Sequence, residues 1–281
     1  MSDKNAKSKL KDLLAQVYSS HLDNQKREIV DDFEKILNIT NVKWRQATKP
    51  KPINNISTLL AVNHFVRPLI LRKSLFTTFD SMTTSAIVTL MHSKITKRKL
   101  TWVVKNDIAE NIIFLSTKLR KIQIAAIDCY NFIGVSKNYP FGQFPKWQNY
   151  LEKGFDIAFY PEGATSRNLK SARLGFIDLL NFLNSHGVGC QILPVSIYFE
   201  NSSFYVNFSN TIKASNDAAE DAHQTMLKIA KGLPENLQGN YKNQSIDKLL
   251  KSQDLLQQAD DPKPEFAAQK VTLIESPSSK K

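Results

Sequence analysis

The sequence has only two cysteines, Cys129 and Cys190, among its 281 residues. Two cysteines cannot build a disulfide framework, and their spacing does not match a metal site, so a reducing, cytoplasmic compartment is expected. Long apolar runs are also missing. The longest, such as residues 192–199, fall far below the ~18 residues of a membrane-spanning helix, and the N-terminus lacks the apolar stretch of a signal peptide. We therefore expect no spanning helix, whereas attachment to a membrane surface stays open.

Several catalytic motifs are absent as well. The sequence contains no G-x-S-x-G nucleophile elbow, no P-loop, no G-x-G-x-x-G and no H-E-x-x-H. These absences disfavour nucleophile-elbow hydrolases, P-loop NTPases, dinucleotide-binding enzymes and zinc proteases of that type.

Negative charge is in short supply. Lys and Arg number 38 against 26 Asp and Glu, which gives a formal net charge of +12. Such a chain attracts phosphates in nucleic acid, in anionic lipid head groups or in a phosphorylated substrate. Nucleic acid is not expected, because the sequence has neither interleaved aromatic residues nor a recognisable nucleic-acid motif. The basic residues 94–99 fit either an anion-binding segment or a solvated loop, and His92 beside them is expected at the surface.

The chain ends differ in pattern from its middle. Residues 1–45 are expected to be helical, because Leu10, Leu13, Leu14 and Val17 repeat at the spacing of one helix face. With its flanking lysines, that face fits association with an anionic membrane surface, or packing on its own domain. Residues 43–54 read as a connector. Residues 214–258 are expected to form a helical C-terminal extension, and residues 259–281 a disordered tail.

Residues 55–213 alternate between short apolar runs and helical patterns. This alternation predicts an α/β fold with a mostly parallel mixed sheet flanked by helices, extended by the helical N- and C-terminal segments. Helices are expected at 106–119, 144–154 and 171–187, and strands at 57–62, 100–105, 122–127, 155–160, 190–199 and 203–209.

Polar residues follow two of these strands directly. Residues 57–62 lead into Asn63-His64, and residues 155–160 lead into Pro161-Glu162-Gly163. Ligands of open α/β sheets bind outside the carboxyl ends of parallel strands. A lone His after a strand is more often structural than catalytic, but two such strand ends favour a site at this edge of the sheet.

Three motifs occur in order along the chain: Asn63-His64, then Tyr160-Pro161-Glu162-Gly163-x-x-Ser166-Arg167, then Leu193-Pro194-Val195. This order resembles the glycerolipid acyltransferases, the lysophosphatidic acid and glycerol-3-phosphate acyltransferase family, over roughly residues 57–210. The resemblance implies transfer of a fatty acyl group from acyl-CoA or an acyl carrier protein thioester to a lysophospholipid or glycerol-phosphate-type hydroxyl, in phospholipid biosynthesis. It also implies a peripheral position on the cytoplasmic membrane face, with no metal and no cofactor besides the acyl donor.

Residue roles follow from the same resemblance. His64 is expected to act as general base, and the acceptor contacts are expected from Glu162, Gly163, Ser166, Arg167, Arg173 and Arg67. After Asn63-His64 and four further residues the family has an Asp, where this sequence has Leu69. The first carboxylate beyond it is Asp80, so we interpret 65–79 as an enlarged loop and expect Asp80 to orient His64. The alternative is that Asp80 is only a helix N-cap.

Two arginines of the family pattern are also replaced. Thr165 stands at the internal Arg of the Glu-Gly block, and Cys129 follows Asp128 where the family has an Arg after an Asp near the end of a middle strand. Cations nearby are the candidates to compensate: Arg167, Lys170 and Arg173, and Arg67, Arg72 and Lys73 in the enlarged loop. Arginine suits a phosphate because its planar guanidinium binds two phosphate oxygens at once. These departures leave a second hypothesis open, a non-catalytic module on the same scaffold that binds lipids or anions.

Overall fold

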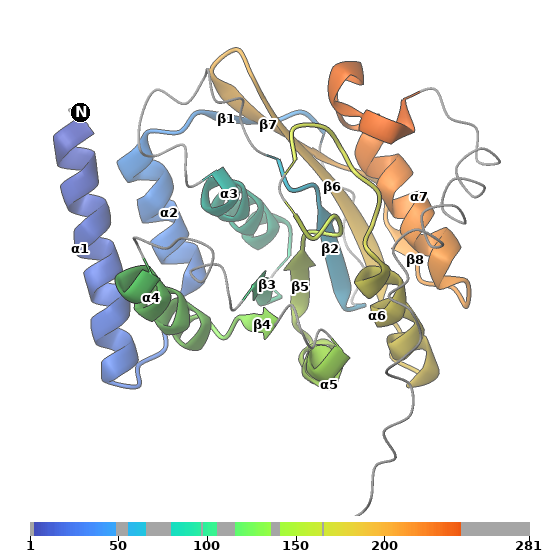
Figure 1. Cartoon of the computed structure of the whole chain (residues 1–281), viewed down its shortest axis with the longest axis horizontal. Helices are drawn as coiled ribbons and strands as arrows, with labels where there is room; N and C mark the ends of the chain where they lie inside the picture. The colour runs from blue at the N-terminus through green and yellow to red at the C-terminus, as the bar shows by residue number, and fades with distance from the viewer. Residues whose placement is uncertain are drawn as a thin grey trace, which may run out of the picture. The chain divides into compact units, whose positions relative to one another are not determined.

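A mixed sheet of eight strands forms the centre of the protein (Figure 1). The computed structural model describes residues 3–48, 56–65, 80–96, 98–105, 116–135, 141–164 and 166–242. The strand order is β1-β7-β6-β2-β5-β3-β4, with β8 paired to β6. The strands are β1 (Trp44–Gln46), β2 (Thr58–Val62), β3 (Leu100–Lys105), β4 (Ile133–Val135), β5 (Asp156–Phe159), β6 (Gln191–Glu200), β7 (Ser203–Phe208) and β8 (Ile212–Lys213).

The middle of the sheet is parallel. β2 pairs in parallel with both β5 and β6, and β3 pairs in parallel with β5 and β4. β6 turns back into β7, which is antiparallel to it, as is β8. Every residue of β2 and β5 is buried, which explains why both strands are apolar after their first residues, Thr58 and Asp156, since parallel strands are covered on both faces. The predicted α/β fold with a mostly parallel mixed sheet is confirmed.

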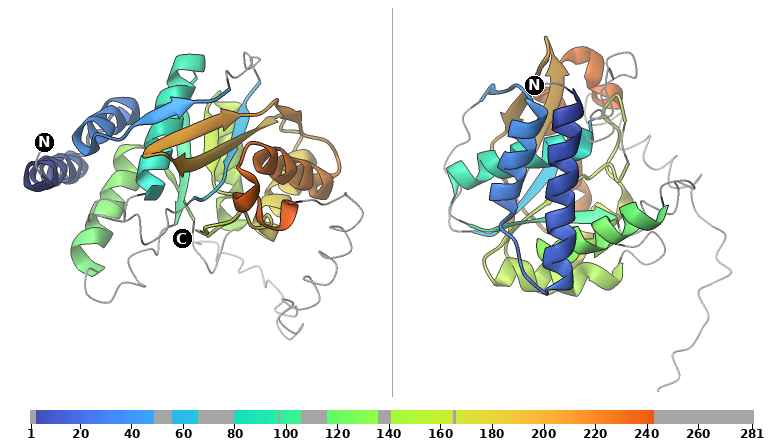
Figure 2. Two further views of the ribbon diagram at one scale, coloured as in Figure 1. Left: turned by 90° about the horizontal axis from the view of Figure 1, so that it is seen from above. Right: turned by 90° about the vertical axis from the view of Figure 1, so that its left-hand side faces the viewer.

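Helices cover both faces of the sheet (Figures 1 and 2). One group, α1 (Asp3–Leu22), α2 (Ile29–Thr40), α3 (Asp80–Ile95) and α4 (Ser116–Cys129), lies on one side. The other side carries α5 (Phe144–Glu152), α6 (Leu174–Ser185) and α7 (Ala218–Lys231). Short 3-10 turns occur at Phe141–Gln143, Glu235–Leu237 and Gly239–Tyr241. Within the described ranges no helix is both long and apolar enough to cross a membrane.

The apolar face of the N-terminal helices is used for packing inside the chain. Leu10 and Leu13 are buried in the same core as the strand residues Leu60 and Val195. A polar contact strengthens the attachment: the buried Asp32 of α2 accepts hydrogen bonds from Arg27 at 2.6 Å and from the Tyr130 hydroxyl, just after α4, at 2.8 Å. The face that fitted a membrane surface is thus largely covered in the structure.

Two predictions of local structure are wrong. Residues 122–127, expected as a strand, lie within helix α4, where Ala125 and Cys129 are buried against Val17 of α1 and Ile124 is exposed. A short apolar run fits either period, and packing against α1 selects the helical one. Consequently Asp128-Cys129 ends a helix and not a strand. The expected connector 43–54 contains the short strand β1, which pairs with β7.

Other predicted segments lie outside the described residues. These are residues 106–115 of the helix expected at 106–119, most of the loop 65–79, residues 243–258 of the expected helical C-terminal extension, and the tail 259–281. Both cysteines are free and buried.

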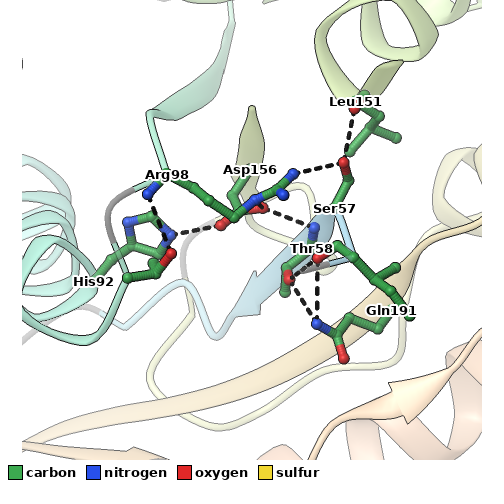
Figure 3. Close-up of polar contacts among 9 residues, drawn as sticks. Ser57, Thr58, His92, Arg98, Leu151, Asp156 and Gln191 are labelled. Atoms are coloured by element: carbon green, nitrogen blue, oxygen red, sulfur yellow. Dashed lines mark hydrogen bonds and ion pairs between the residues drawn. The ribbon is translucent and has the colours of Figure 1, made fainter. Parts of the chain in front are cut away.

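A buried polar cluster ties the starts of β2 and β5 together (Figure 3). Asp156, completely buried, accepts a hydrogen bond from the backbone N–H of Thr58 at 2.8 Å. Its carboxylate also contacts His92 Nε2 at 2.8 Å and Arg98 Nε at 2.9 Å. The surface position expected for His92 is therefore wrong: the residue is 1% exposed because it serves as a partner of Asp156. Arg98, within the basic stretch 94–99, likewise faces this carboxylate.

Candidate active site

His64 and Glu162 follow neighbouring parallel strands and lie side by side. In the pairing of β2 with β5, Ala61 is opposite Phe159. Beyond the carboxyl ends of both strands, the backbone N–H of His64 donates a hydrogen bond to Oε1 of Glu162 at 2.9 Å. The two chain segments pair again in a register shifted by three residues, where an isolated bridge joins Phe65 to Ser166 and the Ser166 N–H donates to the His64 carbonyl at 3.2 Å. The structure therefore brings these two predicted site residues together.

The carboxylate of Glu162 is held by groups of the chain itself. One oxygen, Oε1, accepts the backbone N–H of His64 at 2.9 Å. The other, Oε2, accepts the Ser166 hydroxyl at 2.8 Å and the backbone N–H of Lys170 at 3.1 Å. Glu162 is 2% exposed, and burial raises the pKa of its carboxyl group against these hydrogen bonds. This carboxylate fixes the backbone of His64 and the loop after β5.

The imidazole of His64 is enclosed on one side and hydrogen-bonded on the other. Its Nε2 atom lies 3.0 Å from Oγ of Ser81, while Nδ1 is buried without a hydrogen-bond partner among the described residues. Burial lowers the pKa of His64 to about 4, although the nearby backbone of Ala164 acts in the opposite direction. The ring is thus neutral at pH 7. The Ser81 contact is compatible with both neutral tautomers, and in the one that carries the proton on Nδ1, Nε2 accepts the Ser81 hydroxyl.

Tyr160 positions both partners of this contact. Its ring lies 4.1 Å from that of His64, centroid to centroid. Its hydroxyl donates to the backbone carbonyl of Ser81 at 3.1 Å and contacts the hydroxyls of Ser85 at 2.7 Å and Thr84 at 3.1 Å. The first turn of α3 is thereby anchored to the residue that immediately follows β5.

The side chain of Asn63 has a structural role. Its side chain is buried and bonds the backbone of Ile197 in both directions, with Nδ2 donating to the carbonyl at 2.9 Å and Oδ1 accepting the N–H at 2.6 Å. These two bonds prolong the attachment of β2 to β6 past the last paired residues. The Asn of the Asn-His motif therefore fixes the strand end from which His64 emerges.

The remaining predicted residues divide into three groups. Gly163 turns the loop with a φ of +64°, a conformation that L-residues rarely adopt, and Arg173 Nε donates to the Glu162 carbonyl at 3.3 Å. Arg167 is exposed, and Ser166 is occupied by Glu162 as described. Arg67 and the side chain of Asp80 lie outside the part of the chain that the structure describes, so their predicted roles stay predictions.

Sequence reasoning missed Ser81 and Tyr160. Ser81 directly follows the predicted Asp80, and Tyr160 directly precedes the predicted Pro161-Glu162 turn. Their positions beside singled-out residues were the available signal. The contact between the Ser81 hydroxyl and His64 could not be predicted from the sequence, because it is a tertiary contact between residues 17 positions apart.

The C-terminal part of the described chain closes over the loop after β5. The Leu169 N–H donates to the Leu237 carbonyl at 2.9 Å. Burial and the nearby Glu162 raise the pKa of Tyr241 to about 12, while hydrogen bonding to Ser171 acts the other way. A pocket of about 120 Å³ lies beside the Phe65–Ser166 bridge, lined among others by Phe65, Arg167, Tyr198, Phe199 and Leu237. Within the described residues no three His, Cys, Asp or Glu side chains gather as a metal site requires.

No protein-family model matches the sequence, and no curated protein matches it. Among solved structures, the chain is similar to the crystal structure of the 1-acyl-sn-glycerophosphate (LPA) acyltransferase PlsC from Thermotoga maritima. The two share 12% sequence identity with a TM-score of 0.44, over 75% of this chain and 79% of that chain. Similarity at this level carries no information on activity, which has to be inferred from the residues of this chain.

Proposed function

We propose that the protein is an acyltransferase that moves a fatty acyl group from an acyl thioester to the hydroxyl of a lysophospholipid or glycerol-phosphate-type acceptor. The observation that carries the proposal is His64, a neutral imidazole at the carboxyl edge of two parallel strands with one ring nitrogen bonded to a hydroxyl. A neutral imidazole in this position can take the proton that an attacking hydroxyl must lose. Acyl transfer from a thioester needs this proton transfer.

The rest of the site supports an anionic acceptor. Arg167, Lys170 and Arg173 are exposed on the loop that Glu162 ties to His64. These three side chains lie within a few residues of the Phe65–Ser166 bridge. A phosphate group of the acceptor that binds there brings the acceptor's own hydroxyl group towards His64. The pocket lined by Phe65, Tyr198 and Phe199 adds apolar surface next to the same loop.

These exposed cations also favour the membrane as the place where the acceptor is met. Anionic lipid head groups attract clustered Lys and Arg at close range. We infer that the protein binds an anionic membrane surface peripherally, which co-sedimentation with vesicles containing phosphatidic acid tests. Equal binding to neutral phosphatidylcholine vesicles argues against it.

The test of the function is thioester turnover by purified full-length protein. Palmitoyl-CoA is supplied with lysophosphatidic acid, release of the CoA thiol is followed with a thiol reagent, and the acylated lipid is identified by mass. His64→Ala is expected to lower the rate about 10²- to 10⁴-fold, the usual contribution of a general base. The matched control is His186→Ala, which removes an exposed histidine at the end of α6 and should leave the rate unchanged.

Two outcomes contradict the proposal. If folded His64→Ala turns over the thioester at the wild-type rate, His64 is not the general base. Binding of lysophosphatidic acid without any turnover, with either the CoA or the acyl carrier protein thioester as donor, favours the alternative of a non-catalytic lipid-binding module.

A further inference from the structure

We propose that Ser81 is a catalytic nucleophile that carries the acyl group as an ester between donor and acceptor. The inference rests on the proposed function and deepens it. Oγ of Ser81 lies 3.0 Å from Nε2 of His64, within the range of an activated nucleophile and its base. With such a pair, the acyl group is transferred in two successive steps, first from the thioester to Ser81 and then from Ser81 to the acceptor.

The availability of the ring nitrogens favours this route over direct transfer. In direct transfer, an acceptor hydroxyl must reach a nitrogen of His64. Nδ1 is buried, and Nε2 is already in contact with the Ser81 hydroxyl. The group placed to give its proton to His64 is therefore Ser81 itself, and a substrate hydroxyl reaches Nε2 only after Ser81 has moved or reacted.

The pair is also held rigidly, as a nucleophile requires. The Tyr160 ring packs against the His64 ring at an interplanar angle of 44°, and its hydroxyl bonds the Ser81 carbonyl, so one side chain contacts both partners. Thr84 Oγ1 donates to the same carbonyl at 2.9 Å. On the other flank, Glu162 fixes the backbone N–H of His64. Positioning of reacting groups to this degree is what separates an activated hydroxyl from an ordinary surface serine.

The place of Ser81 in the fold suits the charge that develops. Ser81 lies in the first turn of α3 (Asp80–Ile95), where backbone N–H groups have no partner within the helix. The positive end of the helix dipole stabilises negative charge on Oγ as its proton leaves and on the carbonyl oxygen of the tetrahedral intermediate.

The two steps balance in atoms and electrons. Ser81 Oγ attacks the thioester carbonyl while its proton passes to His64 Nε2; the C–S bond then breaks, and the leaving thiolate takes that proton and departs as the thiol. In the second step the acceptor hydroxyl gives its proton to Nε2 and attacks the Ser81 ester. The bond between Oγ and the acyl carbon breaks, and Oγ recovers the proton. No oxidant, reductant or metal is required.

The experiment traps the ester. Full-length protein is mixed with palmitoyl-CoA without acceptor, quenched in acid, and analysed by intact mass and peptide mapping. We expect one palmitoyl group on Ser81 in the wild type and none in Ser81→Ala or His64→Ala. With acceptor present, Ser81→Ala should release thiol at least about 100-fold more slowly. The control Ser93→Ala, exposed further along α3, should keep both label and rate.

A second measurement tests the nucleophile even if the palmitoyl ester is hydrolysed too fast to detect or the Ser81→Ala variant folds poorly. A fluorophosphonate probe, which reacts with activated serines, should label Ser81 of the wild type and should fail on His64→Ala. Normal thiol release by folded Ser81→Ala, or absence of both palmitate and probe from Ser81 in active wild type, overturns this inference and leaves the proposed function standing. Absence of thiol release from wild type with every donor overturns both.

Discussion

Tyr160 and His64 lie ring to ring, with 4.1 Å between their centroids, while the Tyr160 hydroxyl binds the first turn of α3. The burial that raises the pKa of this hydroxyl keeps it protonated. One residue thus connects the end of β5, the imidazole after β2 and the helix that carries Ser81. The site is organised around this residue, whose hydroxyl is bonded to the start of α3.

Tyr160→Phe tests this positioning. The ring keeps its place on His64, but Ser85 and the buried Thr84 lose a hydroxyl partner, so we expect unfolding free energy to fall by about 1–3 kcal/mol. Because Ser81 is then less well fixed, kcat of thioester turnover should fall about 10- to 100-fold with little change in KM. Tyr150→Phe is the control: its hydroxyl bonds the Asn131 carbonyl, away from the site. Equal effects of the two variants on kcat contradict the positioning role.

The pKa of His64 predicts the acid side of the pH profile. A base with a pKa of about 4 stays neutral down to that pH, so kcat/KM should remain level through pH 5–6, where a histidine with an ordinary pKa near 6.5 is already charged. Glu162, beside His64, also titrates in acid, and burial raises the pKa of its carboxyl group. Glu162→Gln should therefore keep an inflection near pH 4. An inflection near 6.5 in both proteins contradicts a buried neutral base.

The lowered pKa of His64 also makes the free energy of unfolding depend on pH. Because the pKa of His64 is lower in the folded than in the unfolded state, the unfolded chain binds the extra proton between pH 6.5 and about 4. Stability should therefore fall as the pH decreases through this window, by roughly 3 kcal/mol from this residue. Denaturant unfolding at pH 7 and pH 4.5 measures it. His64→Gln should lose less stability over that interval than the wild type, and an equal loss contradicts the prediction.

The sequence was informative where burial alone sets the pattern. β2 and β5 were predicted as strands because both are short, mostly apolar runs, and the polar residues after them reach the same edge because the strands are parallel. Residues 122–127 were misread because their short apolar run satisfies a strand as well as a helix, and only packing of Ala125 and Cys129 on α1 decides. Periodicity carries no information on that tertiary contact.

The finer geometry of the site depends on long-range partners. Asn63 was predicted as half of a catalytic motif. In the structure its side-chain amide is hydrogen-bonded to the backbone of Ile197, which lies far along the chain. Glu162 looked like a substrate contact, and the structure shows three hydrogen bonds from the chain to its carboxylate. Residue type and order located the site, whereas the assignment of each polar atom required the register of three strands and the start of α3.

Asp156 gives a prediction for the opposite edge of the sheet. Asp156→Ala removes a buried carboxylate from His92, Arg98 and the Thr58 N–H at once, which should cost about 3–5 kcal/mol of unfolding free energy. Asp156→Asn keeps an oxygen for Thr58 and should cost less. Because Thr58 and Asp156 begin β2 and β5, the turnover of the folded fraction should be unaffected. Glu34→Ala, an exposed carboxylate on α2, is the control, and equal stability of all these proteins contradicts a structural ion cluster.

A substitution of Gly239 tests whether residues 237–241 support the loop after β5, which includes residues 169–172. Its φ of +57° is unfavourable for an L-residue, and an added Cβ would overlap the Leu169 carbonyl oxygen. Gly239→Ala should therefore displace 237–241 from 169–172, lowering stability by about 1–3 kcal/mol. Since Lys170 of that loop bonds Glu162, turnover should also fall. Gly189→Ala is the matched control, because a Cβ there meets open space. Loss of stability with full turnover would show that the loop holds Glu162 without this support.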